Sequence, residues 1–169
     1  MSGGPKRRVF VALGSNLGER SRSLSHARER LGALPQTELV GESRVYETAA
    51  RDLPGQPPFL NQVVCLETGL EPLALLDHCQ AIETGNGRER TVRFGPRTLD
   101  IDILLFEGVT SDAAELTLPH PRLWERAFVL VPLAEVWDLA RDMPAVDVAA
   151  LAATLAAEQS VEPYDDPEE

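Results

Sequence analysis

The chain has 169 residues, of which 43% are hydrophobic and 25% are charged, as in an ordinary globular protein of one domain. Its net charge of −11 argues against nucleic acid or an anionic membrane surface as a partner, because both are bound by neutralising phosphates. No stretch approaches the roughly 20 apolar residues of a transmembrane helix, and the first residues lack the apolar region of a signal peptide.

The first half of the chain is predicted to alternate strands and helices. A strand is expected at residues 8–13, followed by a turn and a helix at 19–34, whose leucines and alanines recur at three- and four-residue spacing. Further strands are expected at 39–47 and 59–68, separated by a proline-rich run at 48–58 of the length that functional loops have. A second helix is expected at 71–84, with Pro72 in its first turn.

The second half is expected to begin with a turn and a strand within residues 95–106. After it we expect a short strand at 116–118, a helical turn at 122–126, a last strand at 127–132, a helical turn at 133–136 and a helix at 146–158. Residues 159–169 are acidic and contain two prolines, which predicts a disordered tail behind a single domain of residues 1–158. The order β-α-β-β-α-β predicts an α+β fold, a ferredoxin-like layered domain with a mainly antiparallel sheet and helices packed on it.

Two aspartates mark the strand that ends at Phe106. Because side chains alternate along a strand, Asp100 and Asp102 share one face, while Leu99, Ile101, Ile103 and Leu105 share the other. Carboxylates on an otherwise apolar strand are costly unless something offsets their charge. Their separation of roughly 6.6 Å along the strand suits one hard cation or a pair of Mg²⁺ ions.

A basic segment precedes these aspartates. Residues 84–98 hold four arginines, at positions 88, 90, 93 and 97, against one acid, so this window carries +3 in a chain of −11. Arginine donates in pairs to phosphate, so a metal-bound polyphosphate would satisfy both the arginines and the aspartates. The glycines of the segment predict a flexible loop, a lid. The alternative is an ordinary basic loop beside solvent-facing aspartates, and charge and spacing favour the phosphate site.

Other candidates are weaker when the residues are considered alone. His120 lies between Pro119 and Pro121, which presents it rigidly in a loop. Phe59 and Asn61 beside the proline-rich loop suit a flat heterocycle, although a core phenylalanine and an asparagine that binds loop backbone are the favoured interpretation. The cysteines at 65 and 79 lie in apolar patterns, which indicates buried thiols in a reducing cytoplasm.

Several ordered motifs together resemble one enzyme family. They are ALGSNLG at 12–18, Tyr-Glu-Thr at 46–48, Phe-Leu-Asn at 59–61, GRERTVRFGPRTLDIDILLF at 87–106 and LTLPHPRLWERAFVLVPL at 116–133. Over roughly residues 8–137 the chain resembles the 6-hydroxymethyl-7,8-dihydropterin pyrophosphokinases of folate biosynthesis. The resemblance implies an ATP- and magnesium-dependent transfer of pyrophosphate to the pterin hydroxymethyl group, leaving AMP.

The resemblance also implies roles for individual residues. Asp100 and Asp102 would hold two Mg²⁺ ions, and they form the catalytic set with Arg88 and Arg97. The expected ATP-binding residues are Gln80, Glu83, Arg88, Arg90, Arg97, Ile103, Thr117, His120 and Arg126. The expected pterin-binding residues are Thr48, Phe59, Asn61, Phe94, Asp100 and Phe128, with Phe59 and Phe128 sandwiching the ring. This assignment replaces the structural interpretation of Phe59 and Asn61.

The chain departs from the family pattern at a few positions. Phe94 stands where a lid tryptophan is frequent, and Pro121 stands where some members carry tyrosine after the histidine. Glu115 replaces a basic residue found in some members, and Ala-Ala-Arg at 49–51 replaces a Pro-Pro-Leu that occurs in some relatives. The general base stays open between either aspartate and water, because metal coordination makes a carboxylate a poor base.

Two rival functions follow from the residues. A nucleotide-sugar glycosyltransferase also uses a carboxylate-x-carboxylate pair, but 169 residues leave little room for its two substrates. A ligand-sensing domain of ferredoxin-like type would use the basic loop for docking. We expect instead a cytoplasmic monomer that acts on ATP and a pterin, without nucleic-acid or membrane partners.

Overall fold

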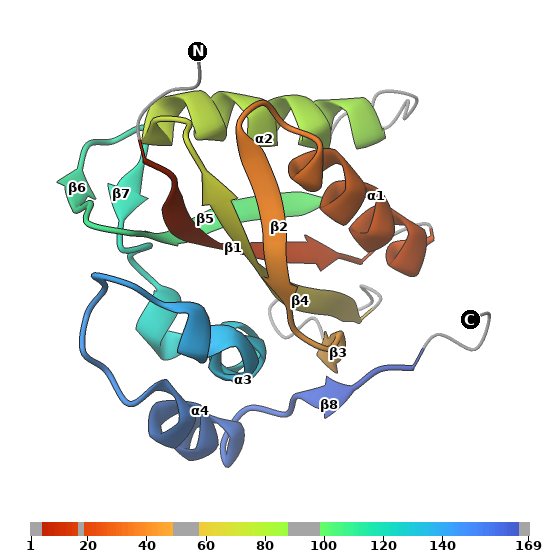
Figure 1. Cartoon of the computed structure of the whole chain (residues 1–169). Coiled ribbons are helices and arrows are strands. Elements are labelled where there is room, and N and C mark those ends of the chain that lie inside the picture. Colours follow the sequence, from red (N-terminus) through yellow and green to blue (C-terminus); the bar gives the residue numbers. More distant parts are fainter. Residues whose placement is uncertain (1–4, 17–18, 49–57, 88–98, 166–169) are drawn as a thin grey trace.

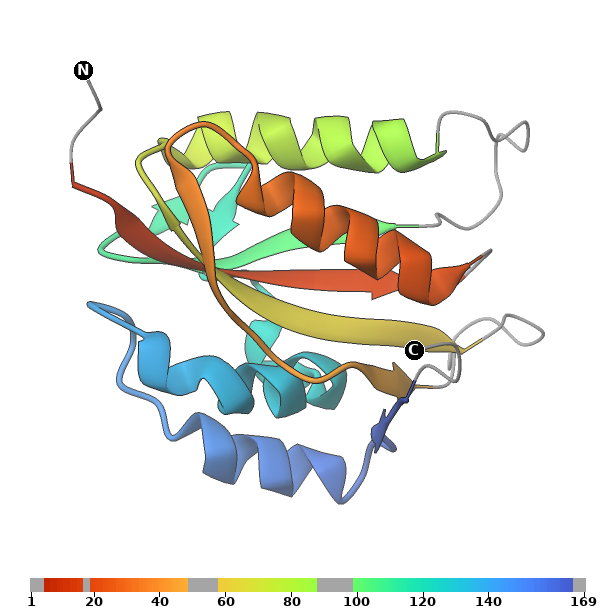
Figure 2. The same cartoon turned by 45° about the vertical axis from the view of Figure 1, so that its right-hand side comes forward.

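The computed structural model describes residues 5–16, 19–48, 58–87 and 99–165. A twisted sheet forms the middle layer, with α1 and α2 over one face and α3 and α4 over the other (Figures 1 and 2). The strands are β1 (Arg7–Ser15), β2 (Thr37–Glu42), β3 (Tyr46–Thr48), β4 (Phe59–Thr68), β5 (Asp100–Phe106), β6 (Ser111–Asp112), β7 (Thr117–Leu118) and β8 (Glu162–Pro163). The helices are α1 (Arg20–Gly32), α2 (Pro72–Gly87), α3 (Ala127–Val136) and α4 (Val148–Ala156), with 3-10 turns η1 (Leu123–Glu125) and η2 (Trp137–Leu139).

The main sheet is antiparallel throughout and runs in the order β5-β1-β4-β3-β8, with β2 also paired to β4. This arrangement of the first five strands and two helices confirms the predicted α+β, ferredoxin-like layering. The single strand predicted at 39–47 is wrong, because it is divided into β2 and β3. Ser43 lies between them, and its hydroxyl rather than its backbone accepts from the Val63 N–H, at 3.1 Å.

Two hydrophobic cores lie on opposite faces of the sheet. Alternate residues of β1 serve the two sides, with Val9, Val11 and Leu13 in the first core and Phe10 in the second. The first core also contains Leu24, Ala27 and Leu31 of α1 and Leu75, Cys79 and Ile82 of α2, which confirms both predicted helices, although Leu73 of α2 is 53% exposed. The second core lies between the sheet and the α3–α4 pair.

A β-bulge divides β5. Val11 pairs with Ile103 whereas the preceding Phe10 pairs with Leu105, so Leu104 is an extra residue in the ladder. The predicted alternation therefore holds through Leu104, which shares the face of Asp100 and Asp102, and is wrong for Leu105 and Phe106. Leu105 joins Leu104 in the second core, and Phe106 turns into the first.

The strand predicted at 127–132 is wrong, because these residues begin α3. A short run of apolar residues fits a buried strand as well as a buried helix, so periodicity does not separate them. In the fold this run packs between β4 and α4, where Leu130 and Leu133 are fully buried and Pro132 lies inside the helix. The helix is favoured because it covers the apolar second face of the sheet.

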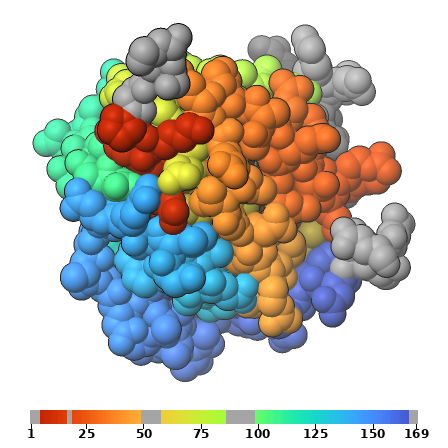
Figure 3. All heavy atoms as spheres, in the orientation of Figure 1, coloured from red at the N-terminus to blue at the C-terminus, as the bar shows by residue number. Residues whose placement is uncertain are grey.

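The disordered tail predicted after residue 158 is also wrong as far as residue 165. Residues 162–163 form β8, which pairs with β3, and the Tyr164 N–H donates to the Val45 carbonyl at 2.9 Å. In Figure 3 the dark blue atoms of this segment lie beside the orange atoms that precede residue 48. Residues 166–169 lie outside the described part of the chain.

Cys65 and Cys79 are both buried, which confirms the expectation of buried thiols. They belong to different cores on opposite faces of the sheet. Burial raises the pKa of the Cys65 thiol to about 11 and that of Cys79 to about 12, so both stay protonated. Within the described residues, no helix combines the length and the apolar character needed to cross a membrane.

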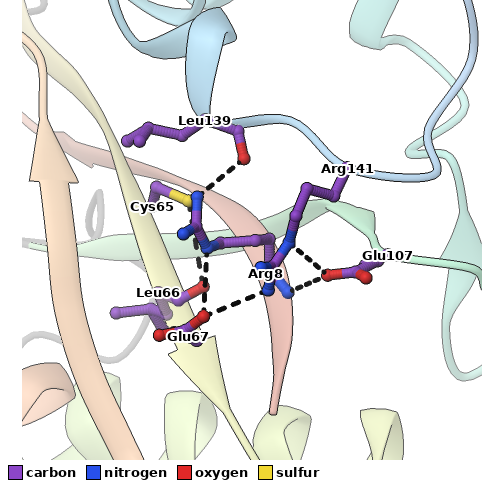
Figure 4. Close-up of polar contacts among 7 residues, drawn as sticks. All are labelled: Arg8, Cys65, Leu66, Glu67, Glu107, Leu139 and Arg141. Atoms are coloured by element: carbon purple, nitrogen blue, oxygen red, sulfur yellow. Dashed lines mark hydrogen bonds and ion pairs between the residues drawn. The ribbon is translucent and has the colours of Figure 1, made fainter. Parts of the chain in front are cut away.

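A charge network joins the end of the sheet to the segment after α3 (Figure 4). The Glu67 carboxylate accepts from the guanidinium groups of Arg8 at 3.3 Å and Arg141 at 3.0 Å. Arg141 also donates to Glu107, and Arg8 donates to the Leu139 carbonyl at 2.9 Å. The hydrogen bond from Arg8, and then the charges of both arginines, lower the pKa of Glu67 below its ordinary value of 4.5.

Replacing Glu67 by Gln should therefore lower stability by about 1 kcal/mol at neutral pH. A carboxylate with a lowered pKa stabilises the fold above pH 4.5, and this stability is lost as the pH falls through the lower folded pKa. The difference from wild type should shrink to nothing in acid, as measured by urea unfolding from pH 7 to pH 3. Glu71→Gln is the matched control, because the Arg7–Glu71 pair has a carboxylate side chain that is 79% exposed. A Glu67→Gln difference that does not change with pH would contradict this account.

Candidate functional site

A cleft of about 830 Å³ opens at one end of the sheet, on the face that carries α3. Because β1 runs antiparallel to both neighbours, its end meets the beginnings of β4 and β5 there. The remaining walls are Thr48 in β3, residues 120–129 around η1 and the start of α3, and residues 158–161 after α4. This volume is typical of a site for small molecules.

Asp100 and Asp102 line this cleft from the beginning of β5. They pair with Gly14 and Ala12 of β1, and the intervening Ile101 is buried in the first core. The predicted split of this strand into a carboxylate face and an apolar face is therefore confirmed over the residues that form the site. Glu83 links α2 to the same strand, because its carboxylate accepts from the Ile101 N–H at 2.6 Å.

His120 is held beside the carboxylates by backbone hydrogen bonds. Its N–H donates to the carbonyl of the bulged Leu104 at 2.9 Å, and its Nδ1 accepts from the Arg122 N–H at 3.2 Å. A neutral imidazole with an occupied Nδ1 carries its proton on Nε2. Burial lowers the pKa of His120, Asp102 opposes this effect, and Arg126 and Arg122 add to it. At neutral pH the ring is thus an uncharged N–H donor.

Polar and aromatic side chains line another part of the cleft. Asn61 is buried and donates from Nδ2 to the Thr48 hydroxyl at 2.9 Å. Gly14 lies beside this amide, and a Cβ at that position would lie 3.4 Å from Asn61 Oδ1. Phe59 and Phe128 also line the cleft, and the Arg126 guanidinium lies 5.5 Å from the centroid of the Phe128 ring.

The structure distributes the predicted residues unevenly. The cleft brings together Thr48, Phe59, Asn61, Asp100, Asp102, His120, Arg126 and Phe128. Outside its lining, Gln80 and Glu83 lie on α2, Ile103 is buried in the first core, and Thr117 donates its hydroxyl to the Ala113 carbonyl. The predicted residues Arg88, Arg90, Phe94 and Arg97 lie outside the described residues.

Sequence reasoning missed residues that support the cleft from behind. Arg20 donates to both the Glu47 carboxylate and the Pro58 carbonyl, each at 2.8 Å, and so joins β3 to the residue before β4. Gln62 is buried on the cleft, where it accepts from Arg28 and donates to the Ser43 carbonyl. No local pattern marks these contacts, because each joins residues at least 19 positions apart.

Thr48→Val should lower the free energy of unfolding, because it removes the Thr48–Asn61 hydrogen bond. The substitution keeps the shape but leaves the buried Asn61 amide without its acceptor, which costs about 1–3 kcal/mol. Thr154→Val is the matched control, because that exposed hydroxyl bonds only its own helix, at the Ala150 carbonyl. Urea unfolding of both variants measures the difference. A Thr48→Val loss no larger than that of Thr154→Val would show that the hydrogen bond contributes nothing.

Comparison with known proteins identifies the family. The model of the 7,8-dihydro-6-hydroxymethylpterin-pyrophosphokinase family matches residues 10–138. The chain is 47% identical over 151 residues to 2-amino-4-hydroxy-6-hydroxymethyldihydropteridine pyrophosphokinase of Pseudomonas aeruginosa, covering 89% of this chain and 91% of that protein. It is 44% identical over 129 residues to the protein of that name from Methylorubrum extorquens, covering 76% and 82%.

A solved structure agrees in fold. The crystal structure of Plasmodium falciparum HPPK-DHPS with pterin and p-hydroxybenzoate matches with a TM-score of 0.67 and 13% sequence identity, over 92% of this chain. The chain spans 44% of the length of that protein. The family match includes the cleft residues of β1, β3, β4, β5 and the start of α3. The chain therefore belongs to the 7,8-dihydro-6-hydroxymethylpterin-pyrophosphokinase family.

Proposed function

We propose that this protein transfers the pyrophosphoryl group of ATP to the hydroxymethyl group of 6-hydroxymethyl-7,8-dihydropterin in folate biosynthesis. The hydroxymethyl oxygen bonds the β-phosphorus and gives up its proton to solvent, the bond from that phosphorus to the bridging α–β oxygen breaks, and AMP leaves. The observation that carries this proposal is that Asp100 and Asp102 share one cleft with Phe59, Asn61 and Phe128. Side chains that suit a metal-bound polyphosphate and side chains that suit a flat heterocycle thus lie in one site.

The heterocycle end suits a pterin. Phe59 and Phe128 offer apolar ring faces for stacking on a flat bicyclic ring. The Asn61 amide, oriented by Thr48, offers both a donor and an acceptor to the polar edge of the ring. A buried amide left unpaired is costly, so this pocket would reject a ring with the wrong edge.

The carboxylate end fits magnesium bound together with ATP. Asp100 and Asp102 are the candidate ligands, because both carboxylates line the cleft from the same face of β5. Mg²⁺ is commonly held by one or two carboxylates, with substrate phosphates and water as its other ligands. Two bound ions would neutralise the polyphosphate and polarise the β-phosphorus.

The remaining cleft residues would orient the nucleotide. His120 is uncharged and carries its proton on Nε2, so it serves as a hydrogen-bond donor to a phosphate rather than as a general base at that atom. Arg126 supplies a permanent cation on the same wall. We propose that Arg88 and Arg97 add phosphate contacts from the segment outside the described residues.

The setting of the reaction follows from the same features. Cys65 and Cys79 lie on opposite faces of the sheet and need no oxidising compartment, which supports a cytoplasmic location. Both ends of the cleft are built from one chain, which supports a monomer as the active unit.

A product assay tests the proposal directly. Purified protein with ATP, Mg²⁺ and 6-hydroxymethyl-7,8-dihydropterin should form AMP and the pterin diphosphate in equal amounts, separated by chromatography. A folded protein that leaves ATP intact would overturn the function. A free nucleoside diphosphate as product would instead indicate a different transferase.

Asp102→Asn should reduce turnover by on the order of a hundredfold or more, because the metal-bound charge stabilisation is worth several kcal/mol. Asp112→Asn is the matched control, since it removes the same charge from an exposed position in β6 outside the cleft. Initial rates at saturating Mg²⁺ and ATP measure both variants. A rate for Asp102→Asn close to that of Asp112→Asn would show that the carboxylate pair does not hold the catalytic metal.

A further inference from the structure

The start of α3 is capped by a residue far along the chain. Arg126 precedes the helix in an extended conformation, with φ −117° and ψ 111°, and its side chain makes no capping hydrogen bond. The first N–H groups of a helix have no partners within it. Gln159 supplies a partner for one of these N–H groups, because its Oε1 accepts from the Ala127 N–H at 2.9 Å. Its Nε2 donates to the Glu125 carbonyl at 3.1 Å.

One carboxamide therefore holds the backbone on both sides of Arg126. Arg126 and Phe128 both line the cleft, and they flank the Ala127 peptide group that Gln159 binds. The Arg126 guanidinium lies over the Phe128 ring, so the two side chains form one wall. Any shift of the Glu125–Ala127 backbone would move a cation and an aromatic ring of the site together.

Gln159 is itself fixed at both ends of its segment. Its N–H donates to the Leu155 carbonyl at the end of α4, at 2.9 Å. Beyond it, β8 pairs with β3, and the Tyr164 ring lies 5.4 Å from the Arg20 guanidinium carbon. Residues 158–161 between these anchors line the cleft. The C-terminal segment is thus a wall of the site, although it lies beyond residues 10–138, which match the family.

We propose that Gln159 is a positioning residue for substrate binding, which acts by holding the Arg126–Phe128 wall at the start of α3. This role rests on the proposed function. Gln159 provides no reacting group. It fixes the backbone that carries Arg126, which we propose contacts phosphate, and Phe128, which we propose stacks on the pterin.

Gln159→Met separates positioning from packing, because methionine keeps the length and volume of the side chain and removes both hydrogen bonds. Misplaced binding groups are costly, so kcat/KM should fall about tenfold, mainly through higher KM values for pterin and ATP. Asp147→Ala is the matched control, since it removes the N-terminal cap of the neighbouring α4, where Asp147 Oδ1 accepts from the Ala150 N–H at 3.0 Å. Asp147 is exposed and lies outside the cleft.

Thermal unfolding should show that both variants lose stability, whereas steady-state kinetics should show raised KM values only for Gln159→Met. KM values for Gln159→Met equal to those of Asp147→Ala, with wild type active, would reduce Gln159 to a structural cap and leave the proposed function standing. Wild-type protein that forms no AMP would overturn the proposed function, and the role of Gln159 would fall with it.

Discussion

The register of β1 between β4 and β5 is the constraint on which the site depends. Gly14, near the end of β1, pairs with Asn61 on one side and with Asp100 on the other. Three adjacent strands thereby bring a buried amide and a carboxylate to one edge of the sheet. A slip of one residue would turn Asp100 and Asp102 into the first core beneath α1 and α2, where burying an unpaired carboxylate is costly. The cores on both faces oppose such a slip, because every side chain of the strand would change sides.

The second face of the sheet turns this edge into a cleft. The first core, with α1 and α2, is closed by aliphatic side chains, whereas α3 covers the other face and begins at the edge that carries the carboxylates. Its position is fixed from both directions, by the bulge at Leu104 that anchors His120 and by the carboxamide of Gln159. Irregular features, a bulge and a remote helix cap, thus place the side chains around the aspartates.

The described lining of the cleft carries charges of both signs. A net charge of −11 would repel a nucleotide, yet Arg122 and Arg126 stand beside His120 on the wall of the cleft. These cations and burial keep the imidazole uncharged, although Asp102 favours its protonation. The cleft thereby holds carboxylates that suit a metal and, close by, donors that suit phosphate. A site for a metal–polyphosphate complex needs both kinds of group.

The sequence by itself determined the elements whose signals are local. Helical spacing identified α1, alternation identified the part of β5 that carries the aspartates, and the ordered motifs identified the family and eight of the residues that line the cleft. Tertiary structure decided the rest. A six-residue apolar run fits a strand or a helix equally well, so only the uncovered face of the sheet made α3 a helix. The bulge at Leu104 depends on pairing with β1, and the acidic segment around Gln159 is ordered by contacts with residues 32 or more positions away, such as the Ala127 N–H. Such contacts leave no local pattern, because the partners meet only after the sheet has formed.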